Sequence, residues 1–93
     1  EEEAIAVAND VDYGLTAGLW SKDFSRAHRV ASKLEAGTVW VNTYRYIRYC
    51  IPYGGVKLSG LGRENGVEAI NSFLETRSTI LNINANFADS YAN

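Results

Sequence analysis

The sequence has no methionine and only one cysteine, one histidine and one proline among 93 residues. A single cysteine excludes an internal disulfide framework and a zinc site built from thiolates, and it fits a reducing compartment. No apolar run approaches the roughly 20 residues of a membrane helix. The first residues are Glu1-Glu2-Glu3, the opposite of a basic signal-peptide start. We therefore expect a cytoplasmic protein without a membrane partner.

Strong charge of either sign is also missing. Nine Lys and Arg against eleven Asp and Glu leave a formal net charge of -2. Such a balance provides no general attraction to nucleic acid. The absence of Met at position 1, together with a helical pattern that begins without a capping residue, favours a segment of a longer protein.

Alternation and helical spacing predict four elements in the first half of the chain. Residues 1–9 have helical spacing, and residues 15–20 form an apolar stretch typical of a strand buried on both faces. Residues 24–35 carry an apolar stripe at steps of three and four, with Ser21 and Asp23 as candidate N-caps. Residues 38–41 are β-branched and aromatic. Strand, helix and strand in this order predict a right-handed parallel βαβ unit.

The second half is less regular. Residues 42–53 have no period, and Gly54, Gly55, Gly60, Gly62 and Gly66 follow closely, which is typical of tight turns. A short helix is expected next, capped by Asn65 with Glu68 in the reciprocal position of a capping box. Apolar residues then alternate with asparagines, which predicts an exposed or edge strand over 78–84 and a frayed tail over 86–93.

The glycine-rich segment was compared with the known phosphate-binding motifs. Residues 60–66 read G-x-G-x-x-x-G, one residue longer than the dinucleotide fingerprint, and no expected strand leads directly into them. Leu61 and Gly62 stand where a P-loop needs Lys and Ser or Thr. The pattern therefore favours turns that pass a packed site, and we assign no cofactor-binding residue to this chain.

Residues 44–49 interleave aromatic rings with guanidinium groups, as single-stranded nucleic-acid surfaces do. The negative net charge and the absence of an RNP-like motif favour a different interpretation, in which the loop packs on a neighbouring domain or lines a pocket. Lys22, Arg26, Arg29 and Lys33 also share one helical face, and such a stripe is usually solvated.

Cys50 is the one candidate nucleophile in this sequence. A catalytic thiolate needs a base or a positive environment, and the single histidine, His28, is expected on a helix beyond a strand. A cysteine beside Ile51 and Pro52 is more often a small packed residue. We predict neither a catalytic residue nor a metal site, because the chain has too few ligand types for a transition metal.

Three motifs occur in an order that resembles one family. These are Tyr13-Gly14-Leu15-x-x-Gly18-Leu19, Glu35-Ala36-Gly37-Thr38-Val39-Trp40-Val41-Asn42, and Pro52-Tyr53-Gly54-Gly55-Val56-Lys57-x-Ser59-Gly60-x-Gly62-Arg63-Glu64. Together they closely resemble the C-terminal segment of NAD(P)-dependent aldehyde dehydrogenases, over residues 1 to about 83. The fold implied is α/β: a βαβ unit of the catalytic domain, then a tunnel loop, a short helix and a C-terminal oligomerisation strand.

The resemblance implies a parent oxidoreductase that oxidises an aldehyde to a carboxylic acid with NAD or NADP. A Cys thiolate would attack the aldehyde, and a thiohemiacetal and a thioester would follow. In the family the nucleophile and the cofactor-contacting residues lie upstream, and Cys50 does not stand in the nucleophile's motif. The remainder of the chain is therefore an implied partner, and this segment alone should bind no cofactor and be inactive.

The resemblance also assigns roles to individual residues. Asn42 would support the active centre from the end of a strand. The residues implied to contact the aldehyde in the tunnel are Tyr44, Arg45, Ile47 and Tyr53. Arg45 and Arg48 replace neutral residues that many family members carry, which is compatible with a carboxylated or otherwise anionic aldehyde.

The resemblance also implies that the C-terminal part of the chain takes part in subunit assembly. By resemblance, residues 1–77 belong to the catalytic domain, and residues 78–93 form the oligomerisation strand and tail of a homodimer or homotetramer. The residues implied at the subunit interface are Arg63, Glu75, Leu81 and Ile83. Arg63 and Glu75 could pair with each other or across subunits. An alternative hypothesis is a non-catalytic, stand-alone module that dimerises through residues 78–84, because an exposed strand edge tends to find a partner.

Overall fold

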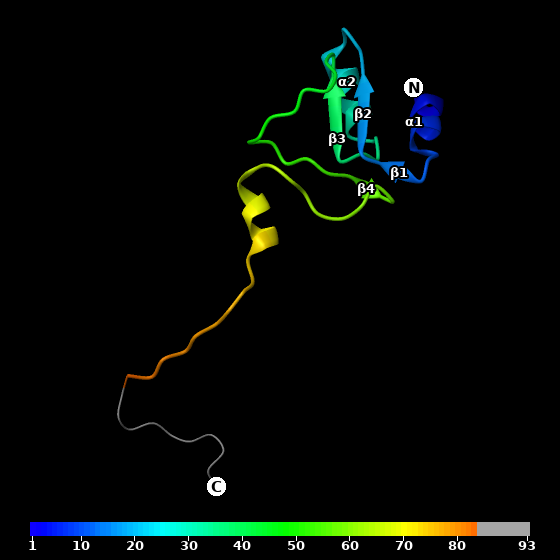
Figure 1. The fold of residues 1–93 in the computed structure, drawn as a ribbon. Coiled ribbons are helices and arrows are strands. Elements are labelled where there is room, and N and C mark those ends of the chain that lie inside the picture. Colours follow the sequence, from blue (N-terminus) through cyan, green and yellow to red (C-terminus); the bar gives the residue numbers. More distant parts are fainter. Residues whose placement is uncertain (84–93) are drawn as a thin grey trace.

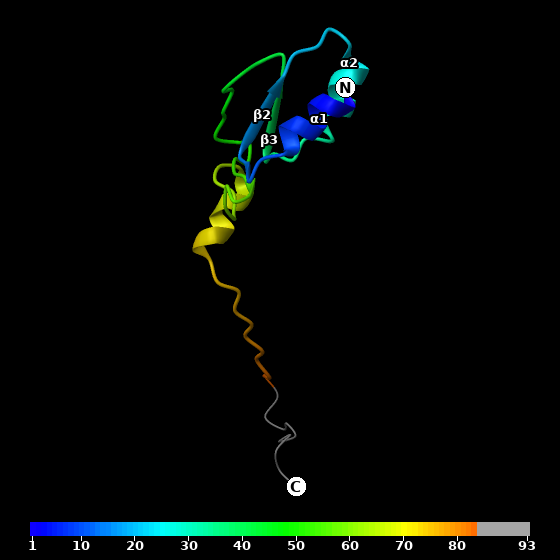
Figure 2. The ribbon, with the colours of Figure 1, turned by 90° about the vertical axis from the view of Figure 1, so that its right-hand side faces the viewer.

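The computed structural model describes residues 1–83. Its centre is a parallel pair of strands, β2 (Thr16–Leu19) and β3 (Thr38–Val41), joined through helix α2 (Phe24–Ala31). Thr16 pairs with Thr38 and Leu19 with Val41. Helix α1 (Glu2–Asn9) lies beside α2 on one side of this sheet, and the loop that follows β3 lies on the other side (Figures 1 and 2). The predicted parallel βαβ unit is confirmed.

Helix α2 begins where the sequence predicts and ends earlier. Asp23 is the N-cap, and its side chain accepts a 3.0 Å hydrogen bond from the Arg26 backbone N–H. The prediction of a helix to residue 35 is wrong, because the chain tightens into three-residue turns after Ala31. The Glu35 N–H then donates to the Asn9 side chain instead of to a helical carbonyl.

A second, smaller sheet was not predicted. Strand β1 (Tyr13–Gly14) pairs antiparallel with β4 (Val56–Lys57). Each strand has two residues, too few for any alternation of apolar and polar residues to be recognised. The pairing brings the glycine-rich segment against the start of the βαβ unit, and it is closed by a 2.9 Å bond from the Gly14 N–H to Ser59 Oγ.

The core of the described residues is small. Ala27 of α2 is 1% exposed and Trp40 of β3 is 7% exposed, and no other hydrophobic side chain among residues 1–83 is buried. Large apolar side chains such as Trp20, Leu61 and Phe73 are well exposed. An apolar surface of this extent is typical of a part of a protein that is covered by further polypeptide.

The region after the glycine-rich segment departs from prediction. Residues Val67–Phe73 form a 3₁₀ helix, η1, whose N-cap is Gly66 and not Asn65. The predicted capping box is wrong, because Asn65 has a left-handed φ of 61°, whereas an N-cap residue normally has extended dihedrals. Residues 74–83 run away from the sheets and belong to neither of them (Figure 1).

The predicted strand over 78–84 is therefore not formed by its described part, residues 78–83. A strand needs a partner to complete its ladder, and neither described sheet includes these residues. Asn84 and the predicted frayed tail over 86–93 lie outside the described residues. No helix within residues 1–83 has the length and apolar character needed to cross a membrane.

Candidate functional site

Asn42 stabilises the junction between strand β3 and the irregular loop that follows it. Its side-chain Oδ1 accepts from the Ser21 N–H at 2.8 Å, and its Nδ2 donates to the Ser21 carbonyl at 2.9 Å. Its own N–H donates to the Leu19 carbonyl at 2.9 Å. The carboxamide thus extends the β2–β3 ladder by one pair beyond Val41. Asn42 has a φ of 56°, a left-handed conformation that turns the chain out of the strand.

The loop folds back over the face of the sheet opposite α2. The Trp40 indole N–H donates to the Tyr46 carbonyl at 3.0 Å, and the Trp40 and Tyr44 rings meet edge to face with centroids 5.4 Å apart. Gly18 pairs with Trp40 in the sheet, and a Cβ atom at Gly18 would lie 3.8 Å from the Tyr44 ring. A Cβ atom at that distance would be in ordinary van der Waals contact, so Gly18 lies directly against this aromatic layer.

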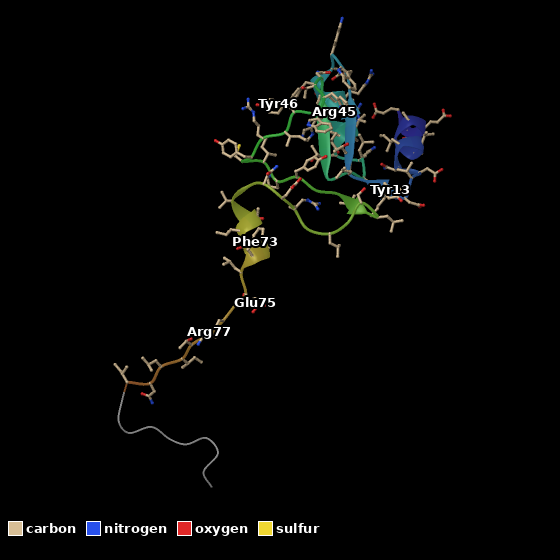
Figure 3. The ribbon with its side chains drawn as sticks, viewed as in Figure 1. Tyr13, Arg45, Tyr46, Phe73, Glu75 and Arg77 are labelled. Carbon is tan, nitrogen blue, oxygen red and sulfur yellow. The ribbon has the colours of Figure 1, made fainter. Side chains whose placement is uncertain are left out.

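Two guanidinium groups lie over the loop's tyrosine rings. The Arg45 guanidinium carbon is 5.3 Å from the centroid of Tyr44, and that of Arg48 is 4.9 Å from the centroid of Tyr46. Arg48 Nε also donates to the Tyr46 hydroxyl at 2.8 Å. Figure 3 shows Arg45 and Tyr46 together on this loop. Stacking of this kind stabilises a cation at an exposed site by about 0.5–1 kcal/mol.

The far end of the loop is tied to the segment that follows the glycines. Tyr53 and Glu64 exchange two backbone hydrogen bonds of 2.8 Å, and the Gly66 N–H donates to the Tyr49 carbonyl at 2.7 Å. Tyr53 is half-buried and lines a groove of about 540 Å³, together with Arg63, Ala69 and Phe73. No hydrogen bond or ring contact within residues 1–83 joins Tyr53 to Tyr44.

Arg63 is turned into the glycine-rich segment. Its Nη1 donates to the Gly55 carbonyl at 2.7 Å and to the Gly62 carbonyl at 2.8 Å. None of the ion pairs among residues 1–83 includes Arg63 or Glu75, so the two do not pair within the described chain. Figure 3 shows Glu75 on the segment that leads away from the sheets, well separated from Arg45 and Tyr46. Leu81 and Ile83 follow on the same segment and are exposed.

Lys57 connects three segments of the chain, a role that the sequence analysis did not predict. Its ammonium group donates to the Asn9 carbonyl at 2.7 Å and to the Val11 carbonyl at 3.1 Å, and it forms an ion pair with Glu35. It therefore joins α1, the turn before β3 and strand β4. No local pattern reveals such a role, because the partners are 22 to 48 residues away in the sequence.

The helical face with basic residues is partly paired. Glu1 receives two hydrogen bonds from Arg29, of 2.8 and 2.9 Å, and lies 3.6 Å from Arg26. The hydrogen bonds from Arg29 lower the pKa of the Glu1 carboxyl from 4.5 to about 2. The prediction of a solvated stripe is confirmed, because Arg26 and Arg29 are exposed, although both also form ion pairs with Glu1 at the start of α1.

No catalytic centre is assembled by the described residues. Cys50 is exposed, and no hydrogen bond or ion pair within residues 1–83 reaches its thiol. No cluster of three or more His, Cys, Asp or Glu side chains is present in that part of the chain. The candidate site consists of an aromatic and positively charged loop and of the groove beside it.

Three backbone amides of the glycine-rich segment are committed to turns and are not available to a phosphate. A phosphate cradle needs free backbone N–H groups. Here the Gly60 N–H donates to Lys57, the Glu64 N–H to Tyr53 and the Gly66 N–H to Tyr49. These amides serve turns, as the sequence predicts.

A parallel βαβ unit whose second strand passes into an irregular loop defines an α/β protein, a class in which ligands commonly bind beyond the carboxyl ends of the strands. The model of the aldehyde dehydrogenase family matches residues 1–79, and the chain belongs to that family. The resemblance of its three motifs is thereby confirmed.

Relatives and solved structures agree with this assignment. The betaine aldehyde dehydrogenase of Cereibacter sphaeroides is 53% identical over 78 residues, which are 84% of this chain and 16% of the relative. The NAD⁺ complex of an aldehyde dehydrogenase from Bacillus cereus superimposes with a TM-score of 0.83 at 46% identity, covering 89% of this chain and 17% of that one. PnpE from Pseudomonas sp. WBC-3 gives 0.84 at 44% identity, covering 97% and 18%. The chain thus spans about a sixth of its relatives' length.

Proposed function

We propose that this chain forms part of a full-length aldehyde dehydrogenase, which oxidises an aldehyde to a carboxylic acid with NAD or NADP through a cysteine thiohemiacetal and thioester. The observation that carries the proposal is the family match over residues 1–79. Because the chain spans only 16% of its betaine aldehyde dehydrogenase relative, the nucleophile and the general base belong to the remainder of the polypeptide.

The nicotinamide cofactor is likewise assigned to the remainder. A related structure from Bacillus cereus is an NAD⁺ complex, which supports NAD for the parent enzyme. The glycine-rich segment departs from the dinucleotide fingerprint, and its Gly60, Glu64 and Gly66 amides are already bonded to backbone carbonyls, so we assign this chain no cofactor contact. We place the enzyme in the cytoplasm, in keeping with the one free, exposed cysteine of this chain.

Within that enzyme the loop over residues 42–53 is the wall of the substrate tunnel. Asn42 fixes where the loop starts, through its two bonds to Ser21. Tyr44, Arg45 and Ile47 lie in the exposed part of the loop, available to an aldehyde side chain. Tyr53, fixed by its bonds to Glu64, contributes its ring from the adjoining groove. Their contribution is orientation of the aldehyde and exclusion of water, with no bond made or broken on this chain.

The segment after η1 provides the subunit contact of a homodimer or homotetramer. Glu75, Leu81 and Ile83 are exposed along it. Its backbone belongs to neither described sheet, and an exposed apolar edge of this kind is suited to pairing with another subunit. Arg63 supports the contact indirectly, by holding the carbonyls of the glycine-rich segment.

The proposal is tested with the full-length enzyme by following NAD(P)H formation from a series of aldehydes. Tyr53→Ala should raise KM about tenfold, because a ring that packs against the substrate is lost. Tyr53→Phe keeps the ring and should stay near the parent value. Tyr13→Ala, which removes an exposed ring on strand β1, is the matched control. Failure of the full-length enzyme to reduce NAD(P)⁺ with any aldehyde would refute the function.

A further inference from the structure

The loop lies in a long stretch of chain without carboxylates. From Ala36 to Arg63 the sequence has no Asp or Glu, and it carries Arg45, Arg48, Lys57 and Arg63. Two of these cations already have strong partners, since Lys57 is bound to Glu35 and Arg63 to backbone carbonyls. The positive charge of the other two is not neutralised by any ion pair among residues 1–83.

These two cations are held in place by the loop itself. Arg45 lies over the Tyr44 ring and Arg48 over the Tyr46 ring, and Arg48 Nε donates to the Tyr46 hydroxyl. The tyrosines are in turn fixed by Trp40, through its contact with the Tyr44 ring and its bond to the Tyr46 carbonyl. Rings anchored on a strand therefore hold two guanidinium groups at an exposed surface, where each retains donors for an anion.

This arrangement bears on the choice between a cationic and an anionic substrate. Tyrosine faces are good receptors for a quaternary ammonium group. Here a guanidinium already lies over each of the two rings, so the protein's own cations occupy one face of each ring. Two positive charges that have no ion-pair partner among residues 1–83 also repel a second cation. The relatives named betaine aldehyde dehydrogenase act, by name, on such a cation.

We propose that the loop selects an aldehyde that carries a carboxylate at the end remote from its carbonyl group, with Arg45 and Arg48 as the residues that bind this carboxylate. A guanidinium fork matches a carboxylate with two parallel hydrogen bonds. The inference rests on the proposed function, because it takes the loop over residues 42–53 as the wall of the substrate tunnel. It assigns a substrate class different from the one in its relatives' names.

The experiment compares three aldehydes on the full-length enzyme: betaine aldehyde, succinic semialdehyde as the anionic probe, and butyraldehyde as the neutral probe of matched length. We expect the largest kcat/KM for succinic semialdehyde. Arg45→Met and Arg48→Met should each lower that value about tenfold to hundredfold, the usual effect of losing a charged hydrogen bond. The same variants should lower the value for the neutral aldehyde by a clearly smaller factor, because only the anion loses a charged hydrogen bond. Lys33→Met removes a positive charge outside the loop and should change none of the three.

The outcomes separate this inference from the function on which it depends. A parent enzyme that prefers betaine aldehyde, or arginine variants that lose activity equally toward anionic and neutral aldehydes, would overturn the inference and leave the aldehyde dehydrogenase intact. An enzyme that reduces NAD(P)⁺ with none of the three aldehydes but with others overturns the inference alone, whereas one that reduces it with no aldehyde refutes the proposed function and the inference together. Arg45→Lys and Arg48→Lys keep the charge without the planar fork, and they should retain part of the preference for the anion.

Discussion

The carboxamide of Asn42 bonds both backbone groups of Ser21, so that one side chain adds a pair to the end of the parallel ladder. The bond lengths are 2.8 and 2.9 Å. The same residue has the left-handed φ of 56° that turns the chain into the loop. Asparagine serves both purposes, since it accepts this conformation more readily than most residues and has a donor and an acceptor.

The first prediction concerns this residue. Asn42→Ala should destabilise the end of β3 by about 2 kcal/mol, roughly half from the lost bonds and half from the left-handed conformation. Asn42→Gly removes the bonds and relieves the strain, so it should cost about half as much. Hydrogen exchange of the Ser21 amide in the full-length enzyme measures both. Equal protection in the parent and in Asn42→Ala would contradict the role given to the side chain.

The second prediction concerns the approach of Gly37 to the glycine-rich segment. A Cβ atom at Gly37 would collide with the Gly54 carbonyl, whereas one at Gly18 would come no closer than 3.4 Å to the Trp20 ring. Gly37→Ala should therefore lower the free energy of unfolding by about 3 kcal/mol or more, because backbone has to move. Gly18→Ala is the matched control and should stay within about 1 kcal/mol of the parent in denaturant titrations.

The third prediction is a pH dependence of the contact between α1 and α2. Arg29 lowers the pKa of Glu1 from 4.5 to about 2. A depressed carboxyl pKa means that the ion pair stabilises the fold fully above about pH 4.5, and that this contribution is lost as the pH falls toward 2. Glu1→Gln should remove this part of the dependence. NMR titration of the Glu1 carboxyl carbon tests it, and a midpoint near 4.5 would show that the pair does not form.

The fourth prediction concerns assembly. Glu75→Lys should weaken the oligomer of the full-length enzyme, because it reverses a charge on the exposed segment proposed to meet a second subunit. Glu68→Lys, on the exposed surface of η1, makes the same change of charge outside the proposed contact. Sedimentation velocity at several concentrations reads the result. An unchanged mass for Glu75→Lys, or an equal loss in both variants, would count against the contact.

Much of the βαβ unit could be predicted because its signals are local. The apolar stripe of α2, the Asp23 cap and the β-branched run of β3 each involve neighbouring residues, and all three appear in the structure. The strands of the second sheet could not be predicted, since two residues carry no period. The capping box at Asn65 failed for a related reason: the bonds from Glu64 to Tyr53 and from Gly66 to Tyr49 impose turn geometry on the residue between them.

For the candidate site, too, some features could be predicted from the sequence and others could not. The residue types of the loop and the three family motifs were readable from the order of amino acids, because a motif is a local pattern and its chemistry is that of its side chains. The places of these side chains depend on contacts between segments: Asn42 on the backbone of Ser21, Lys57 among three segments, and Arg63 on the Gly55 carbonyl. Such contacts join residues brought together by chain closure, and their energy exists only once the backbone has folded.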